Sequence, residues 1–286
     1  MAIKKVLVVG LGIMGRGILQ VCAQAGFESY GYDVSEDAVN KTSDHIARSL
    51  DGRVKKGKIT EEEKINTLKN IHTVSDLNKA KDVDLAIEAV FEDFKVKQDV
   101  FRQLDQVLQP DAILGSNTSA LPATPLASAT SRPDKFIIIH FHQPPTVMRL
   151  IEVVRAIQTS DETAAAAVAF CKAIDKDPVE IKIDCPGFLT NRTMIPLLNE
   201  VIYCLYEGVA TKEDIDLAYK SGFHWPMGPV QLCDFIGLDT LLHIMEDLHQ
   251  RRGGDKFLPC PLLSNMVAAG YLGYKSGKGF YDYAKK

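Results

Sequence analysis

Two histidines, a glutamine and a glutamate occur together in HFHQPPTVMRLIEVV, the segment 140–154. His140 lies at the end of an apolar run and Glu152 lies inside the next one. An imidazole is the side chain best suited to accept a proton near neutral pH, and a neighbouring carboxylate can orient it and stabilise its charged form. The two residues could therefore remove the hydroxyl proton of an alcohol whose carbon gives up a hydride. Taken singly, they would be interpreted as a core histidine and a solvated charge on a strand face.

His142 adds a second interpretation, which is a metal site. His140 and His142 are two apart on an expected strand and share a face, so they are a plausible pair of ligands. Zinc takes three or four protein ligands, and the sequence shows no third ligand of suitable spacing. We therefore expect no metal here.

The segment VLVVGLGIMGRG also carries chemical meaning, because Gly10, Gly12 and Gly15 form G-x-G-x-x-G after an expected strand and before an expected helix. In this motif the first glycine permits a tight turn, the second lets the backbone approach a pyrophosphate, and the third lets the helix pack on the strand. The phosphates then meet the free N–H groups of the helix N-terminus. Ile13 and Met14, inside the motif, are expected to contact the same dinucleotide.

Asp33 follows the second expected strand, eighteen residues after Gly15. Its carboxylate can accept hydrogen bonds from a ribose 2′-hydroxyl and would repel a 2′-phosphate, which favours NAD over NADP. A glycine turn with no ligand, and FAD or another adenine dinucleotide, are the alternatives.

The elements that must position these residues alternate along the first 180 or so residues. Such alternation indicates parallel strands joined by crossovers, and we expect an α/β, Rossmann-like, doubly wound, mostly parallel sheet. Apolar runs predict strands at 3–9, 28–33, 84–90, 112–119, 136–142 and 150–156, and helical spacing predicts helices at 15–26, 96–109 and 123–130, with two polar helices between 35 and 70.

The pattern changes at Cys185, after which long apolar stripes indicate helices and no strands. Thr211 and Asp214 are spaced as a capping box at the start of one of these helices. We expect an NAD-binding Rossmann domain at 1–184 and a smaller, all-helical domain for substrate binding and dimerisation at 185–286. A helical unit this apolar is expected to bury surface against a second copy, giving a homodimer.

The composition fits a soluble globular protein, with 46% hydrophobic and 24% charged residues in a chain of 286. A net charge of −4 gives no general attraction to nucleic acid or to an anionic membrane. No apolar run approaches the length of a membrane span, and no targeting segment is expected. The six cysteines contain no C-x-x-C pair, which favours reduced thiols in a cytoplasmic protein.

Beyond these patterns, the sequence resembles the 3-hydroxyacyl-CoA dehydrogenases, close to the short bacterial 3-hydroxybutyryl-CoA dehydrogenases. The resemblance runs nearly end to end and is most specific where SNTS precedes HF and where a proline-glycine-phenylalanine motif enters the helical part. The matching segments are VVGLGIMGRGI, DVSEDA, IEAVFEDFKVK, SNTSALP, HFHQPPTVMRLIEVV, CPGFLTNR, WPMGPVQLCDFIGLDT and GYKSGKGFYDY.

The resemblance implies an NAD-dependent oxidoreductase that interconverts an L-3-hydroxyacyl-CoA, expected to be a short one such as 3-hydroxybutyryl-CoA, and its 3-oxoacyl-CoA in fatty acid metabolism. It implies that His140 is the general base, that Glu152 orients it, and that Ser119 and Asn191 bond the reacting end of the substrate and the nicotinamide region. The other positions it assigns to NAD are Glu92, Lys97, Gln143 and Lys275, and those it assigns to CoA are Ser49 and Lys56. Lys56 also lies in a small basic cluster with Lys55 and Lys58, whose charge would suit CoA phosphates or would simply be solvated.

The chain departs from the family where the usual H-F-F-N-P-V-P-V-M reads HFHQPPTVM. His142 replaces an aromatic residue, Gln143 replaces an asparagine, and Pro145 and Thr146 alter the substrate path. These changes leave open the same hydride chemistry on a hydroxylated substrate without CoA. The β-hydroxyacid dehydrogenases fit less well, because they use a catalytic lysine where this chain has Asn191. A non-catalytic dinucleotide-binding protein is a further alternative.

Overall fold

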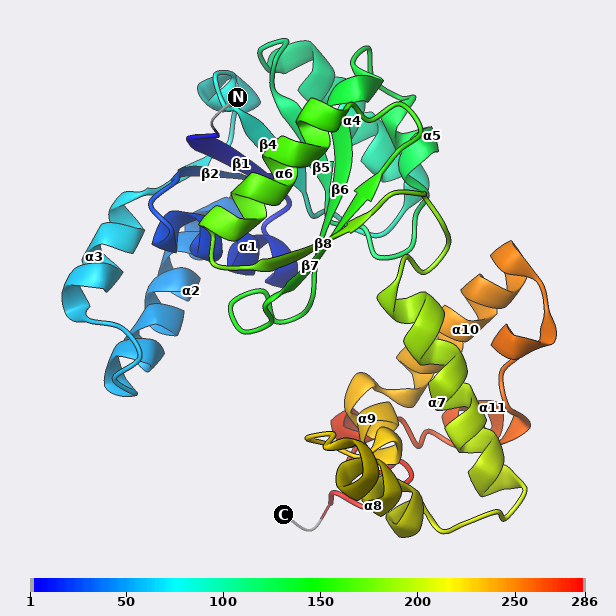
Figure 1. The fold of residues 1–286 in the computed structure, drawn as a ribbon. Helices are drawn as coiled ribbons and strands as arrows, with labels where there is room; N and C mark the ends of the chain where they lie inside the picture. The colour runs from blue at the N-terminus through cyan, green and yellow to red at the C-terminus, as the bar shows by residue number, and fades with distance from the viewer. Residues whose placement is uncertain (1–2, 285–286) are drawn as a thin grey trace. The chain divides into compact units, whose positions relative to one another are not determined.

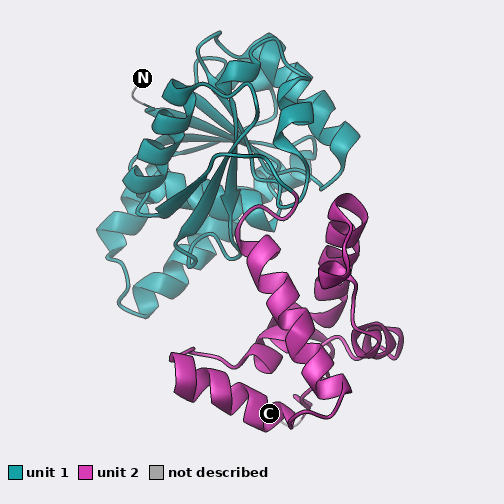
Figure 2. Cartoon of the chain, turned by 45° about the vertical axis from the view of Figure 1, so that its right-hand side comes forward, with its two compact units in different colours: residues 1–185 teal, residues 186–286 magenta. Residues whose placement is uncertain are grey.

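The computed structural model describes residues 3–284. The chain divides into two compact units at Cys185, so the described residues of the first unit are 3–185 and those of the second are 186–284. Figure 2 colours the two units separately. The first unit contains a sheet covered by helices, and the described part of the second contains helices and short turns without a strand. The α/β class with a second, helical unit is therefore confirmed, while the roles predicted for the two units stay predictions.

The sheet of the first unit has eight strands in the order β3-β2-β1-β4-β5-β6-β7-β8 (Figure 1). Every neighbouring pair is parallel except β6 with β7, as a mostly parallel sheet requires. The chain order reverses between β1 and β4, and this switch point is where open α/β sheets bind ligands at the carboxyl ends of their strands. The strands are β1 (Lys5–Val9), β2 (Glu28–Tyr32), β3 (Ile71–Val74), β4 (Leu85–Glu88), β5 (Ile113–Ser116), β6 (Phe136–Phe141), β7 (Leu150–Arg155) and β8 (Asp177–Ile181).

One connection departs from the strand-helix alternation. Segment 142–149 joins β6 to β7 without a helix, and the two strands run antiparallel. A parallel crossover needs about a dozen residues or more, so a connection this short can only make a hairpin. The hairpin is the feature on which the candidate site depends.

Two strands were not predicted, and both lie at the edges of the sheet, β3 at one side and β8 at the other. They are short, and their residues are only partly apolar. Pro178 within β8 lacks an amide hydrogen, which only an edge strand tolerates. The apolar runs that identify buried strands are therefore missing from these two.

Helices cover both faces of the sheet, because alternate strand residues point in opposite directions. Val6, Val8 and Ile139 belong to one buried cluster with Ile18 of α1 and Phe170 of α6. On the opposite face, Phe136 of β6 meets Phe101 of α4 edge to face, with ring centroids 5.0 Å apart. The helices of this unit are α1 (Ile13–Gln24), α2 (Glu36–Lys55), α3 (Glu61–Lys69), α4 (Phe94–Val107), α5 (Ala123–Ala127) and α6 (Asp161–Ala173), with short 3₁₀ turns at Leu77–Ala80 and Pro133–Lys135.

The second unit packs its helices around Ile202, Leu241, Met245 and Phe257. The predicted helix start at Thr211 is confirmed, since its side chain accepts a hydrogen bond from the Asp214 amide at 3.2 Å. The helices are α7 (Thr190–Tyr206), α8 (Lys212–Phe223), α9 (Pro229–Ile236), α10 (Leu238–Arg252) and α11 (Pro261–Ala268), with 3₁₀ turns at Asp255–Phe257 and Tyr274–Ser276.

A buried carboxylate fixes the end of the second unit. Asp234 of α9 accepts hydrogen bonds from the amides of Phe280 and Tyr281, both at 2.9 Å, and from the Tyr283 hydroxyl at 3.1 Å. Burial raises the pKa of Asp234 above its usual range. The C-terminal segment is therefore held to α9 by polar contacts, which the apolar pattern of the sequence does not predict.

Within residues 3–284, no helix combines the length and the apolar character needed to cross a membrane. Cys22, Cys171, Cys233 and Cys260 are buried free thiols, and burial raises the pKa of each. Such thiols pack as small apolar side chains.

Candidate active site

A pocket of about 570 Å³ opens beside the glycine-rich turn at the carboxyl ends of β1, β2 and β4. The sequence motif lies directly on it, because α1 begins at Ile13, immediately after Gly12. The residues around it are mostly apolar, as the flat face of an adenine requires. From the motif and the strand ends they include Gly10, Gly12, Ile13, Met14, Asp33, Val90 and Phe91.

The structure shows what a side chain at each glycine of the motif would contact. Gly10 has φ +95°, and a Cβ there would lie 2.7 Å from the Ala89 carbonyl oxygen. A Cβ on Gly15 would lie 1.7 Å from the Gly10 carbonyl oxygen, so helix and strand could not pack as they do. At Gly12 an added Cβ would meet nothing within 4 Å. Phosphates can therefore approach the backbone at the N-terminus of α1, and the site fits a dinucleotide.

Asp33 is held at this pocket by the backbone around it. Its Oδ2 accepts from the Leu11 amide at 2.7 Å and its Oδ1 from the Ser35 amide at 2.9 Å. These bonds fix the carboxylate between the glycine turn and the end of β2, where its negative charge disfavours a 2′-phosphate. Its geometry is that of a group that accepts hydrogen bonds from a ribose.

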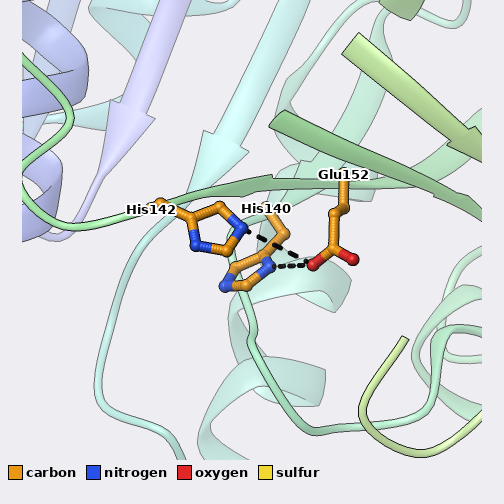
Figure 3. A group of neighbouring side chains, drawn as sticks. All are labelled: His140, His142 and Glu152. Carbon is orange, nitrogen blue, oxygen red and sulfur yellow. Dashed lines mark hydrogen bonds and ion pairs between the residues drawn. The ribbon is translucent and has the colours of Figure 1, made fainter. Parts of the chain in front are cut away.

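His140 and Glu152 are direct partners across the antiparallel β6–β7 pair. Their side chains meet, with His140 Nδ1 2.9 Å from Glu152 Oε2 (Figure 3). Glu152 is 1% exposed and His140 7% exposed, so a charged carboxylate needs this partner. Because Nδ1 is engaged by the carboxylate, Nε2 is the ring nitrogen that can exchange a proton with a substrate.

The loop after β5 is clamped from two sides. Asn117 Oδ1 accepts from the Phe141 amide at 2.9 Å, which ties the loop to the end of β6. On the other side, Glu92 accepts from the Thr118 hydroxyl and from the Ser119 amide. Ser119 is thus exposed on a fixed loop beside the end of the histidine's strand. Ser119 was predicted as a site residue from the sequence, whereas Asn117 and Thr118 of the same SNTS motif were not.

Lys97 of α4 lies in a charge cluster, which we define as the buried residues Lys97 and Glu88 and the exposed Glu92. Its Nζ is 2.6 Å from Glu88 Oε1 and 3.1 Å from Glu92 Oε2, and the side chains of Lys97 and Glu88 are 1% and 0% exposed. Burial raises the pKa of Glu88 in spite of the ammonium. Burial opposes ionisation of Glu92 as well, but Lys97 and the bond from Thr118 outweigh it and lower its pKa. Lys97 therefore fixes Glu92, and through it the Ser119 loop.

Glu88 was missed by the sequence analysis. Its signal was a carboxylate inside the apolar run DLAIEAV, which marks a buried charge in need of a partner. Ser116 supplies a further bond, since its hydroxyl donates to Glu88 Oε2 at 2.7 Å.

The hairpin loop 142–149 is also held by a buried cation. Lys176 Nζ donates to the carbonyl oxygens of Pro145 at 2.6 Å and Met148 at 2.7 Å. Burial and the nearby Arg149 lower the pKa of Lys176. On its other side the loop meets α1, because a Cβ on Gly17 would lie 3.1 Å from the Pro145 ring. Gln143, bonded to Pro144 through a cis peptide, is exposed in this loop.

The remaining predicted residues lie on other elements of the two units. Ser49 and Lys56 are exposed near the end of α2 in the first unit. In the second unit, Asn191 lies in the first turn of α7 and Lys275 lies in the 3₁₀ turn Tyr274–Ser276, where its Nζ is 2.7 Å from Asp239 Oδ2. Their contacts with cofactor or substrate stay predictions.

Glu152 changes the argument about a metal. The sequence showed no third ligand beside His140 and His142, but the hairpin supplies one: potential ligand atoms of His140, His142 and Glu152 lie within 4.8 Å of one another. We expected no metal because the sequence offered only two ligands, and the fold places a third beside them.

Comparison with known proteins covers both units. Residues 5–185 match the family described as "3-hydroxyacyl-CoA dehydrogenase, NAD binding domain", and residues 187–283 match "3-hydroxyacyl-CoA dehydrogenase, C-terminal domain". A probable 3-hydroxybutyryl-CoA dehydrogenase of Bacillus subtilis is 46% identical over 286 residues, covering 100% of this chain and 99% of the relative. One from Deinococcus radiodurans is 48% identical over 276 residues, covering 96% and 99%. The crystal structure of (S)-3-hydroxybutyryl-CoA dehydrogenase PaaH1 from Ralstonia eutropha superimposes with a TM-score of 0.94 at 43% identity, covering 99% of this chain and 100% of that one.

The charge cluster predicts a large and pH-dependent loss of stability on replacing its cation. Lys97→Met leaves Glu88 buried without its counter-charge and should lower the free energy of unfolding by about 3–5 kcal/mol at neutral pH. In the variant the folded-state pKa of Glu88 rises further above its unfolded value. A carboxyl with a raised folded-state pKa destabilises the folded chain as the pH rises from its unfolded-state pKa to its folded-state pKa. The loss of unfolding free energy in the variant should therefore shrink as the pH is lowered toward about 5. Urea unfolding followed by circular dichroism at both pH values measures this.

Lys95→Met is the matched control, because Lys95 is exposed on the same helix two residues earlier. It should change stability by less than about 0.5 kcal/mol. A Lys97→Met deficit that equals the control, or that is unaffected by pH, would contradict the role of the cluster.

Proposed function

Since the chain belongs to the 3-hydroxyacyl-CoA dehydrogenase family and is an NAD-dependent oxidoreductase, we propose that it interconverts short-chain L-3-hydroxyacyl-CoA, such as 3-hydroxybutyryl-CoA, and the 3-oxoacyl-CoA. The observation that carries this proposal is the contact of 2.9 Å between His140 Nδ1 and Glu152 Oε2 at the carboxyl end of β6. The preference for a short acyl chain is supported by relatives that match over nearly their full length and are named probable 3-hydroxybutyryl-CoA dehydrogenase. A role in fatty acid metabolism follows from that substrate.

His140 acts as the general base in this proposal. Its Nε2 takes the proton of the C3 hydroxyl, so the oxygen can form a carbonyl as C3 gives up its hydride. NAD, when bound, supplies the hydride acceptor. Glu152 stabilises the imidazolium that results, and in the reverse direction the imidazolium returns the proton to oxygen.

Ser119 and Asn191 are proposed to bond the oxygens at the reacting end of the substrate. The charge cluster supports this for Ser119, because Glu92 holds the Ser119 amide at 3.1 Å and Lys97 holds Glu92. Lys97 is then a positioning residue, and Glu92 is the member of the cluster whose side chain is 39% exposed. Gln143 and Lys275 are proposed to contact the nicotinamide half of NAD.

The CoA part is proposed to bind at Ser49 and Lys56. Lys55, Lys56 and Lys58 are all exposed around the C-terminus of α2, where three cations can face phosphate groups. A substrate without CoA is the second candidate, since His142 and Gln143 change the hairpin loop that lies beside the base.

A homodimer through the second unit is part of the proposal. Leu217, Phe223, Phe235 and Tyr274 are exposed there, with Phe223 at 69% and Phe235 at 68%. Large apolar side chains that remain in water favour burial against a second copy of the same surface.

Replacement of His140 tests the base. His140→Ala should lower kcat by about 10²–10⁴-fold, as expected for loss of a general base, while leaving NADH binding unchanged. Turnover is followed by NADH absorbance and binding by NADH fluorescence. His72→Ala, at an exposed position on the edge strand β3, should leave both unchanged. Ample residual turnover in His140→Ala would reject the assignment.

A substrate panel tests the CoA requirement. The chain should oxidise 3-hydroxybutyryl-CoA and not free 3-hydroxybutyrate, and Lys56→Glu should raise KM for the thioester roughly tenfold by losing one charge-assisted contact, with KM for NAD unchanged. Lys69→Glu, an exposed lysine at the end of α3, is the control. Equal turnover of the free acid would favour the second candidate.

Sizing chromatography tests the dimer. The chain should elute at twice its mass of 31.5 kDa. The double replacement Phe223→Glu and Phe235→Glu should give a folded monomer, because burying two carboxylates in an apolar interface is unfavourable. Ile157→Glu, at a site 84% exposed in the first unit, should leave the dimer intact. Elution of the unmodified chain as a monomer would refute the proposal.

A further inference from the structure

His142 has a ring nitrogen whose environment is incomplete. Among the described residues, its Nε2 is buried and has no hydrogen-bond partner. The nearest charged atom is Glu152 Oε2, 3.7 Å away, beyond hydrogen-bond distance. Buried polar nitrogens are nearly always satisfied, so an orphaned one directed at a carboxylate marks a place for a further group. Figure 3 shows the His142 ring directed at the same oxygen that His140 contacts.

The hairpin holds the three side chains close together. His140 and Glu152 face each other across β6 and β7, and His142 follows the last residue of β6. The two imidazole rings lie 4.8 Å apart, centre to centre. The strand register fixes the backbone positions of His140 and Glu152, and the potential ligand atoms of the three side chains lie within 4.8 Å of one another.

The two separations between the carboxylate oxygen and the histidine nitrogens lie near that of neighbouring ligands on a tetrahedral ion. Zinc binds imidazole nitrogen and carboxylate oxygen at about 2.0–2.2 Å, which places neighbouring ligand atoms about 3.3 Å apart. The carboxylate oxygen is 2.9 Å from the nitrogen of His140 and 3.7 Å from that of His142, on either side of this value. Two histidines and one glutamate are a known donor set for zinc, with a fourth position for water. Mg²⁺ and Ca²⁺ prefer oxygen ligands and fit less well.

We propose that His140, His142 and Glu152 bind one divalent transition-metal ion, with Zn²⁺ as the best-fitting ion, and that the bound ion inhibits the enzyme. The ion replaces the proton shared by His140 and Glu152 and occupies the imidazole and the carboxylate that the reaction uses. The side chain of His142 is 25% exposed although its Nε2 is buried, so the proposed site lies next to solvent. Binding does not depend on the proposed function, whereas inhibition rests on His140 being the base.

Metal binding is measured directly on the full chain. Zinc titration by calorimetry should show one ion per chain, and Co²⁺ should give visible absorption bands without the sulfur-to-metal band that cysteine thiolates produce. His142→Phe, which restores the aromatic residue of the resembling family, should weaken zinc binding at least tenfold. His72→Phe removes an exposed histidine from β3 and should bind as the unmodified chain does. His142→Gln is a second variant, and circular dichroism shows that each variant is folded.

The activity measurement separates the site from the mechanism. Each variant is compared with and without zinc, relative to its own activity without metal. Zinc should inhibit the unmodified chain, a chelator should restore turnover, and His142→Phe should resist inhibition at the same zinc concentration. Absence of stoichiometric binding, or a zinc affinity in His142→Phe and His142→Gln equal to that of the unmodified chain, overturns the metal site. If zinc binds as expected but does not inhibit turnover, the metal site is supported and the proposed inhibition is overturned. The role of His140 as the base in the proposed function is then overturned as well.

Discussion

The candidate site depends on the register of one antiparallel strand pair. Because β6 and β7 are joined by a short hairpin, His140 and Glu152 face each other across the pair and their side chains meet at 2.9 Å. A shift of one residue in this register would turn the Glu152 side chain to the opposite face of the sheet, which is the apolar cluster of Val6 and Val8. Backbone pairing therefore places the His140 imidazole opposite the Glu152 carboxylate before any side-chain torsion is chosen.

The surrounding contacts hold this pair in a fixed frame. Asn117 ties the Ser119 loop to the end of β6, the charge cluster holds the same loop from the other side, and Lys176 holds the hairpin loop by two carbonyl oxygens. Two of these anchors use a buried lysine. Since an ammonium removed from water is costly, each is stable only while its oxygen partners stay in place, which gives the loops one preferred arrangement.

Much of this could be predicted from the sequence, for identifiable reasons. Central strands such as β1 and β6 are buried on both faces and consist mostly of apolar residues, and the glycine motif has steric causes that act within a few residues. The edge strands β3 and β8 lack that apolar signature. The residue types of His140 and Glu152 indicated a base and its carboxylate, but the position of His142 relative to Glu152 depends on the hairpin.

The buried charges were harder to predict. Glu88 stands in an apolar run and could have been recognised as needing a partner, whereas Lys176 lies in the polar stretch DKDP and has the local pattern of a solvated lysine. Only the long-range contact with the loop 142–149 reveals its burial. Residues of the second unit, such as Asn191, are known by motif alone, and their roles stay predictions.

The contact between Gly17 and Pro145 limits how this protein can evolve. A Cβ at position 17 would press on the proline ring at 3.1 Å, and the helix that carries residue 17 also presents its N-terminus to the cofactor. The two positions are consequently not independent sites of variation. A larger residue at position 17 requires the Pro145 ring to give way by a few tenths of an ångström, so changes in this helix and in the loop 142–149 would be coupled historical steps.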